Sequence, residues 1–394
     1  MPGSVILSGA RTPIGKLSGA FASMSATDLG GVAIAGALER GGVSPEDVDY
    51  VIMGQVIQAG AGQITARQAA VNAGIPMNVP ATTINKVCLS GLNAIYLADL
   101  MIEAGDADIV VAGGMESMTN APYLMPGARA GYRAGDKTVV DSMMYDGLFC
   151  AFDQVAMGAG TEKYAASAGL ERGPQDDFSA VSHQRAADAI KNGLFDDEIV
   201  PVAVPQRKGD PVEVTTDEGV RGDTTAESLG NLRPAFDKAG NITAGNASQI
   251  SDGASATIVV SKAKADELGI TGLGEVVGYG QVAGPDPSLL TQPSRAIKDA
   301  LDGSSVGQSD IGLYELNEAF AAVGLASMDD LGIDADITNV NGGAIALGHP
   351  VGMSGNRLAL TLLNEMKRRG VEHGAAALCG GGGQGDALIV RALG

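Results

Sequence analysis

Apolar residues in the first part of the chain form short runs that alternate with longer segments of helical periodicity. Short apolar runs bounded by Gly, Pro and polar residues are typical of buried strands, whereas longer periodic segments are typical of helices. The sequence therefore predicts strands at 4–8, 50–54, 81–85 and 108–114, and helices at 26–40, 63–73 and 89–104. The helix expected at 89–104 is apolar around much of its circumference, which predicts a place in the protein interior.

The same order of elements recurs in the second half of the chain. Segment 43–51 matches segment 306–314, and Asp47 stands 263 residues before its counterpart Asp310. At nearly the same offset, Ser90-Gly91 matches Ser354-Gly355 and strand 110–114 matches strand 376–381. An offset this steady predicts a duplicated α/β unit, with buried strands in mixed or parallel pairing and helices on both faces.

A different kind of sequence separates the two copies. From about 119 to 249 the chain is richer in charged residues, Gly and Pro, with helices expected at 158–168 and 174–192. We predict an inserted loop domain at 119–249. The N-terminal half then comprises residues 1–118 plus 250–270, and the C-terminal half comprises residues 271–394.

Composition narrows the functional classes. The net charge of −20 argues against nucleic-acid binding, which needs clustered Lys and Arg, and requires a local basic patch for any anionic ligand. No apolar stretch approaches the roughly 20 residues that span a bilayer, and the N-terminus lacks the features of a signal peptide. We expect a cytoplasmic protein that does not bind membranes.

Cysteine and histidine are both scarce, with three of each. We therefore expect neither a disulfide scaffold nor a metal site. Cys88 directly precedes a predicted helix, where free backbone N–H groups stabilise a thiolate. Because buried cysteines are also often inert, position alone leaves both interpretations open. We expect Cys150 to be structural, and His183 and His373 to lie on the surface.

The second half supplies partners for Cys88. If a pseudo-twofold axis relates the repeats, the loop that contains His349 approaches Cys88, and Cys–His pairing is a standard way to activate a thiol. Cys379 precedes a Gly-rich turn that fits a dinucleotide motif, but the strand at 387–390 follows where that motif needs a helix. An oxyanion site built from backbone N–H groups suits the turn better. Asn317 is either a helix N-cap or a polar group facing the shared cleft.

Six motifs in family order resemble those of thiolases, and the resemblance covers essentially the whole chain. They are Asn85-Lys86-Val87-Cys88-Leu89-Ser90-Gly91, Gly113-Gly114-Met115-Glu116-Ser117-Met118, Asn246-Ala247-Ser248, Asn317-Glu318-Ala319-Phe320, Gly348-His349-Pro350-Val351-Gly352-Met353-Ser354-Gly355 and Cys379-Gly380-Gly381-Gly382. The resemblance implies a thiolase-like α/β fold, in which duplicated units form a layered αβαβα core with an inserted loop domain.

The resemblance also implies catalytic roles. Cys88 would be the nucleophile that takes an acyl group from a CoA thioester, and His349 would accept its proton. Cys379 would be the acid/base, with an acidity close to neutral pH. His349 and a water held by Asn317 would stabilise the enolate, while the N–H groups of Cys88 and Gly381 would stabilise the tetrahedral intermediate. No metal or redox cofactor would be needed.

For CoA binding, the resemblance implies contacts from Leu148, Met157, Arg221 and Ser248. Two positions depart from the family pattern: Ala156 stands where many short-chain biosynthetic thiolases have His, and Gln249 stands where Gly is common. These departures bear on acyl-chain selectivity rather than on the chemistry.

The implied function is reversible condensation of two acetyl-CoA to acetoacetyl-CoA, or thiolytic cleavage of short-chain 3-ketoacyl-CoA, by a homodimer or homotetramer. One alternative is a longer-chain 3-ketoacyl-CoA thiolase of fatty-acid β-oxidation. Others are a non-catalytic acyl-CoA or lipid-binding relative and a ketoacyl-carrier-protein synthase, which would place two histidines near its nucleophile.

Overall fold

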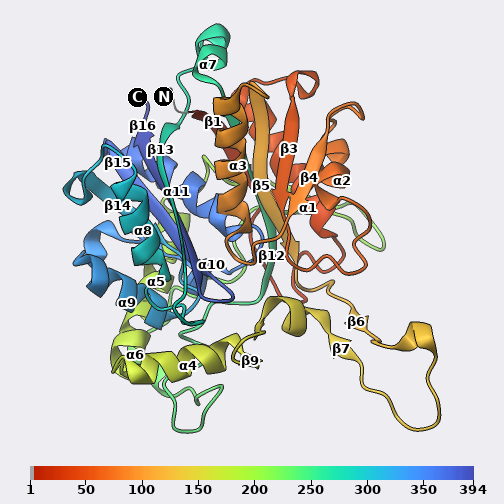
Figure 1. Ribbon diagram of the computed structural model, residues 1–394, viewed down its shortest axis with the longest axis vertical. Helices are drawn as coiled ribbons and strands as arrows, with labels where there is room; N and C mark the ends of the chain where they lie inside the picture. Colours follow the sequence, from red (N-terminus) through yellow and green to blue (C-terminus); the bar gives the residue numbers. More distant parts are fainter. Residues whose placement is uncertain (1–3) are drawn as a thin grey trace.

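The computed structural model describes residues 4–394, and one large mixed sheet runs through it (Figure 1). Its strands lie in the order β14-β15-β16-β13-β1-β12-β5-β3-β4. Their bounds are β1 Val5–Arg11, β3 Tyr50–Gly54, β4 Ala81–Ile84, β5 Ile109–Ser117, β12 Ser251–Val260, β13 Gly274–Ala283, β14 Ile311–Leu316, β15 His373–Gly380 and β16 Gln384–Ala392, and the short β2 (Gly15–Lys16) pairs with β12. The predicted strands are confirmed, with ends that differ by a few residues.

The sheet shows the duplication directly. In the first half β3 pairs parallel with β4 and β5, and β12 then pairs antiparallel with β5 and β1. In the second half β14 pairs parallel with β15, and β16 pairs antiparallel with β15 and β13. A parallel bridge between Tyr314 and Thr338 stands where β4 lies in the first copy. The halves share one sheet, because two residue pairs, Val5 with Glu275 and Ile6 with Gly274, join β1 to β13.

Two helices lie at the centre of the layers. α3 (Ser90–Ala104) and α11 (Ser354–Arg369) pack together between the half-sheets, in a core that includes Leu92, Ile95 and Leu358. Neighbouring strand residues face opposite cores, since Ile6 joins this central core while Leu7 packs in the outer core beneath α1 (Ala26–Gly41). The outer faces are covered by α1 with α2 (Thr65–Asn72) on one side, and by α8 (Gln292–Asp302) with α9 (Ala321–Leu331) on the other. The result is the expected αβαβα order.

Within residues 4–394, one stretch, 87–104, is long and apolar enough to cross a membrane by length and composition alone. It contains α3. Because α3 packs against α11 and the sheet, its apolar character is that of a core helix.

The segment 119–249 extends from one end of the sheet (Figure 1). Both predicted helices are present, as α4 (Met157–Ser167) and α5 (Arg172–Lys191). The remaining elements are short: α6 Ala226–Gly230, and the strand pairs β6 (Tyr123–Leu124) with β7 (Val140–Asp141), β8 (Phe149–Cys150) with β9 (Val155–Ala156), and β10 (Val202–Val204) with β11 (Val212–Val214). The fully buried guanidinium of Arg11 on β1 bonds the Glu198 and Asp217 carboxylates, tying this segment to the sheet.

Two further short helices are α7 (Lys262–Leu268) and α10 (Ala344–Leu347). Single helical turns lie at Pro45–Asp47, Ala128–Ala130, Met143–Gly147, Gln308–Asp310 and Ala335–Ile337. α10 leads directly into the loop that contains His349. Residues from the loops that follow β4, β14, α10 and β15 meet residues of segment 119–249 at one cavity, although they are distant in sequence.

Candidate active site

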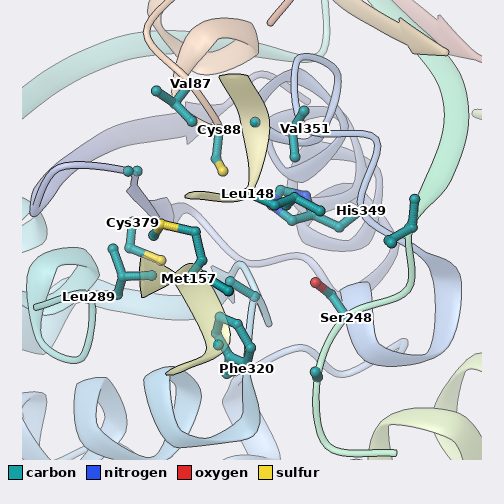
Figure 2. Close-up of a pocket in the computed structure, with 18 of the residues that line it drawn as sticks. Val87, Cys88, Leu148, Met157, Ser248, Leu289, Phe320, His349, Val351 and Cys379 are labelled. Carbon is teal, nitrogen blue, oxygen red and sulfur yellow. The ribbon is translucent and has the colours of Figure 1, made fainter. Parts of the chain in front are cut away.

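A cavity of about 280 Å³ lies where the two halves meet segment 119–249. Cys88, His349 and Cys379 border the same space in Figure 2, as the pseudo-twofold relation of the repeats predicts. The walls are otherwise mostly apolar. They include Val87, Met118, Met144, Leu148, Ala156, Met157, Phe236, Ser248, Gln249, Ile250, Leu289, Phe320, Val351 and Gly381.

The loop between β4 and α3 presents Cys88 in a strained conformation. Val87 has φ of 52°, in the left-handed region that β-branched residues rarely adopt. Local hydrogen bonds hold it there: the Asn85 side chain accepts from the Val87 N–H at 2.9 Å, and the Ser90 hydroxyl donates to the Val87 carbonyl at 2.6 Å. The Ser90 oxygen also accepts from the Lys86 N–H at 2.8 Å. The sharp turn directs the Cys88 sulfur into the cavity.

The resting thiol of Cys88 is protonated. Burial, with a smaller contribution from the negative charge of Glu116, raises its pKa to about 12. The backbone N–H groups of Cys88 and Gly381 act in the opposite direction and lower this pKa. The amide donors expected at a helix start are therefore present, but burial outweighs them.

His349 carries its unprotonated nitrogen at Nε2. The Ser354 hydroxyl donates to the Pro350 carbonyl at 3.0 Å, so it accepts from His349 Nδ1–H at 2.5 Å. On the other side of the ring, Asn317 Nδ2 lies 3.3 Å from Nε2 and donates to it. Burial and the charge of Arg357 lower the pKa of His349 to about 3. The imidazole is thus a neutral base.

Asn317 follows β14 directly, and its N–H donates to the Ala377 carbonyl at 2.9 Å. Because α9 begins at Ala321, Asn317 is not its N-cap. Its Oδ1 atom is buried and has no hydrogen-bond partner among the described residues. The interpretation of Asn317 as a polar group of the site therefore fits the structure better than the capping role.

Cys379 lies near the end of β15, 1% exposed. Burial raises its pKa well above the ordinary thiol value, and a negative charge on Cys88 would raise it further. The expected acidity close to neutral pH is therefore wrong for the resting protein. The glycine-rich segment after Cys379 is a hairpin turn into β16, where Gly383 has φ of 71° and lies so close to Asp286 that a Cβ atom would meet its carbonyl oxygen at 2.1 Å.

Of the residues expected to contact CoA, Leu148, Met157 and Ser248 line the cavity. Arg221 is exposed and lies outside the cavity lining. Its backbone N–H donates to His183 Nδ1 at 3.2 Å. The prediction of a surface position for His183 is wrong: it is 3% exposed, on the inner face of α5, and burial with the Arg221 charge lowers its pKa to about 4. His373 is partly exposed at the start of β15.

The two departures from the family pattern both lie at the cavity. Ala156 contributes a small apolar surface. The Gln249 amide donates to the carbonyls of Gly219, Ile345 and Ala346 at 3.0–3.1 Å. Gln249 thereby ties the loop around Gly219 to α10, and its N–H donors bond backbone carbonyls.

The sequence places Glu116 in one of the six motifs but assigns it no role. It is fully buried on β5, and its carboxylate accepts from the N–H groups of Val56, Ile57 and Gly352 at 2.9–3.1 Å. Glu116 therefore joins the loop after β3 to the loop that follows His349. Burial raises its pKa to about 7. A charged residue within the otherwise apolar strand 109–117 was the available signal.

A duplicated α/β fold whose shared cleft holds a thiol, a neutral imidazole, a second thiol and converging amide donors defines a class of cysteine-dependent acyl-transfer proteins. Family models sharpen this assignment: residues 4–263 match "Thiolase, N-terminal domain" and residues 270–392 match "Thiolase, C-terminal domain". The chain belongs to the thiolase family.

Similar proteins span the whole chain. A probable acetyl-CoA acetyltransferase of Mycolicibacterium smegmatis is 57% identical, over 98% of this chain and 100% of the relative. An acetyl-CoA acetyltransferase of Cupriavidus necator is 53% identical over 98% of both. The crystal structure of the Bacillus anthracis acetyl-CoA acetyltransferase superposes with a TM-score of 0.97 at 40% identity, covering 100% of this chain and 99% of that one.

Proposed function

We propose that the protein is an acetyl-CoA C-acetyltransferase, which reversibly condenses two acetyl-CoA to acetoacetyl-CoA and CoA through an acyl group on Cys88. The observation that carries the proposal is the meeting of Cys88, His349 and Cys379 in one cavity, from loops far apart in sequence. Full-length relatives named acetyl-CoA acetyltransferases support the choice of substrate.

In the first half-reaction, His349 Nε2 takes the proton of the Cys88 thiol as the sulfur attacks the thioester carbonyl. The tautomer set by Ser354 leaves Nε2 unprotonated and able to accept the proton in this step. The amides of Cys88 and Gly381, which favour negative charge beside them, bind the developing oxyanion. The bond from carbonyl carbon to the CoA sulfur breaks, and CoA leaves as a thiol after taking a proton from Cys379.

In the second half-reaction, the Cys379 thiolate removes a proton from the methyl group of another acetyl-CoA. The resulting enolate oxygen is stabilised at His349 Nε2 and at a water held by the unpartnered Oδ1 of Asn317. The enolate carbon attacks the acetyl carbonyl on Cys88, and the Cys88 sulfur leaves and recovers a proton. The balance is two acetyl-CoA consumed, and one acetoacetyl-CoA and one CoA formed.

These steps use side chains and backbone amides of the chain itself, with CoA thioesters as substrates and no cofactor. In residues 4–394, no group of three or more His, Cys, Asp or Glu is arranged to hold a metal ion. We further propose a cytoplasmic homodimer or homotetramer in fatty-acid metabolism, a setting that suits an acidic protein acting on small-molecule thioesters. Binding of nucleic acid or membranes is not part of the proposal.

The site argues against one alternative class. A ketoacyl-carrier-protein synthase would place two histidines at the nucleophile, whereas His349 is the sole histidine lining the cavity in the described part of the chain. A longer-chain 3-ketoacyl-CoA thiolase stays the second candidate, because the cavity wall is predominantly apolar. A thiolysis series across 3-ketoacyl-CoA chain lengths separates the two, and highest kcat/KM with acetoacetyl-CoA is the result we expect.

Acyl-enzyme trapping tests the chemistry. The protein is incubated with acetyl-CoA, quenched in acid, and its peptides are analysed by mass spectrometry. We expect one acetyl group on the peptide containing Cys88, none in Cys88→Ala, and undiminished labelling in the matched control Cys150→Ala, since Cys150 lies outside the cavity lining. Acetylation or turnover by Cys88→Ala contradicts the proposal, and CoA binding without any thiolysis by the parent protein points to a non-catalytic relative.

A further inference from the structure

A buried polar network lies behind the nucleophile loop, outside the cavity. Lys86, two residues before Cys88, places its Nζ atom 2.7 and 2.9 Å from the two carboxylate oxygens of Asp386, and 2.6 Å from Gln281 Oε1. Asp386 is fully buried on β16, whereas the Lys86 side chain is 20% exposed. The first half of the chain thus contributes the cation, and the second half contributes its acceptors.

Aromatic and amide groups complete the network around Asp386. The Tyr279 hydroxyl donates to Asp386 Oδ2 at 2.5 Å and accepts from Asn93 Nδ2 at 3.2 Å. The rings of Tyr279 and Tyr96 are stacked, with centroids 4.0 Å apart and planes 6° from parallel. Because Asn93 and Tyr96 lie on α3, the helix that follows Cys88 is held to the same carboxylate as the loop that precedes it.

The network joins the loop that contains Cys88 to the β15–β16 hairpin that contains Cys379, two segments far apart in sequence. Asp386 directly follows Gly385, the residue paired with Cys379 in the β15–β16 hairpin. The two segments are also in close contact, since a Cβ atom added to Gly380 would lie 2.6 Å from Leu89. A small shift of the hairpin relative to the nucleophile loop would therefore move both Cys379 and the Gly381 amide relative to the Cys88 sulfur.

We propose that Lys86 and Asp386 form a positioning pair for catalysis, which fixes the nucleophile loop (residues 85–89) against the β15–β16 hairpin and so sets the alignment of Cys88 with the Gly381 amide and Cys379. The catalytic part of this inference rests on the proposed thiolase function. Neither residue touches the cavity, so the pair acts through Cys88, Gly381 and Cys379.

The test compares Lys86→Met, Asp386→Asn and the double variant with the parent enzyme. Lys298→Met is the matched control, because it removes a lysine at 2.9 Å from Asp330 on the protein surface. Thiolysis of acetoacetyl-CoA gives kcat and KM for CoA, thermal unfolding gives Tm, and hydrogen exchange follows the peptides covering 85–92 and 378–386. The double variant separates positioning from stability, because it leaves no buried charge unpaired.

We expect kcat to fall about 100-fold in both single variants, the loss typical of a misplacement of about 1 Å, with KM changed by less than about threefold. The double variant should regain most of the Tm lost by Lys86→Met but none of the lost kcat. Amide exchange should become faster in residues 85–92 and 378–386 of all three variants. Lys298→Met should match the parent in every measurement.

Either of two kinetic results overturns the inference: kcat within about threefold of the parent in the single variants, or kcat that recovers together with Tm in the double variant. Unchanged exchange at 85–92 and 378–386 overturns it equally. If the parent itself does not cleave acetoacetyl-CoA, the proposed function is wrong, and the exchange comparison still decides whether the pair holds the two segments together.

Discussion

Arg11 provides the sharpest test of how segment 119–249 is held to the sheet. Its guanidinium donates to Glu198 at 2.8 Å and to both oxygens of Asp217 at 2.7 and 2.9 Å, and all three side chains are less than 5% exposed. Arg11→Met removes the cation and leaves two buried carboxylates. Each retains one other donor, the Thr361 hydroxyl for Glu198 and the Ile14 N–H for Asp217.

Breaking a buried ion pair by removing one partner costs about 3–5 kcal/mol, because the remaining charge is uncompensated. We take about 4 kcal/mol for Arg11→Met, since both carboxylates keep a hydrogen-bond donor but neither keeps a direct ion pair. At roughly 2 °C per kcal/mol for a large domain, Tm should fall by about 8 °C. KM for CoA should also rise, because Asp217 anchors the loop around Gly219, whose carbonyl accepts from the cavity residue Gln249.

Differential scanning calorimetry and urea unfolding measure the loss, with Lys264→Met as the control. Lys264 pairs with the exposed Glu267, so its removal should change stability by no more than about 0.5 kcal/mol. Neutralising all three groups, as Arg11→Met with Glu198→Gln and Asp217→Asn, should restore part of the lost stability. A loss below about 1 kcal/mol in Arg11→Met would refute the argument that this triad carries the anchoring of the segment.

Three further outcomes follow from the site. Ser354→Ala should lower kcat about tenfold with little change in KM, because His349 loses the acceptor that fixes its tautomer. Steady-state thiolysis kinetics measure both constants, and a tenfold change in KM with unchanged kcat would contradict the prediction. Gly383→Ala should lower kcat at least 100-fold, because a Cβ atom there meets the Asp286 carbonyl at 2.1 Å and displaces the turn that holds the Gly381 amide. The control Gly269→Ala has a similarly positive φ but open space around it, so it should lower stability by only about 1 kcal/mol and leave activity unchanged. Because the pKa of His349 is lowered to about 3, the imidazole stays neutral at mildly acid pH, and kcat/KM should not fall near pH 6.5. By linkage, His349 makes the folded state less stable as pH falls from about 6.5 toward 3, because the unfolded chain then binds a proton that the folded protein does not. A fall in kcat/KM at pH 6–7 that disappears when His349 is replaced would contradict the assignment.

The arrangement of the fold was largely predictable, because a duplicated unit repeats its sequence pattern at a constant offset that is visible in a single sequence. The offset of Asp47 and Asp310 is realised as matched strands β3 and β14, and the pseudo-twofold relation brings His349 to Cys88. The pairing of β1 with β13, which joins the two half-sheets, was not predictable. It depends on two residue pairs of β1 and β13, whose apolar sequences would suit an edge or a central strand equally.

Burial explains the errors at the site. His183 lies among polar neighbours in sequence, which suggested a surface position, but α5 turns it inward and the Arg221 N–H satisfies it. The acidity of Cys379 was inferred from its implied chemistry, whereas its pKa depends on how completely the cavity excludes water, a property of the assembled fold. The role of Glu116 was not predictable, because its three amide donors come from loops about 60 and 236 residues away in sequence.

The opposed pKa shifts of Cys88 and His349 have a consequence for the proposed reaction. With the thiol pKa raised and the imidazole pKa lowered, the resting site carries no thiolate–imidazolium pair, which suits an apolar cavity where separated charges are costly. The same amides that would stabilise a Cys88 thiolate are the donors needed by the carbonyl oxygen in the tetrahedral intermediate. Because burial keeps the sulfur protonated until a thioester arrives, these donors are not committed to a stable resting anion. As the sulfur loses its proton and attacks, negative charge forms on the carbonyl oxygen of the substrate. The Cys88 and Gly381 amides then act chiefly on the transition state, where their stabilisation raises kcat.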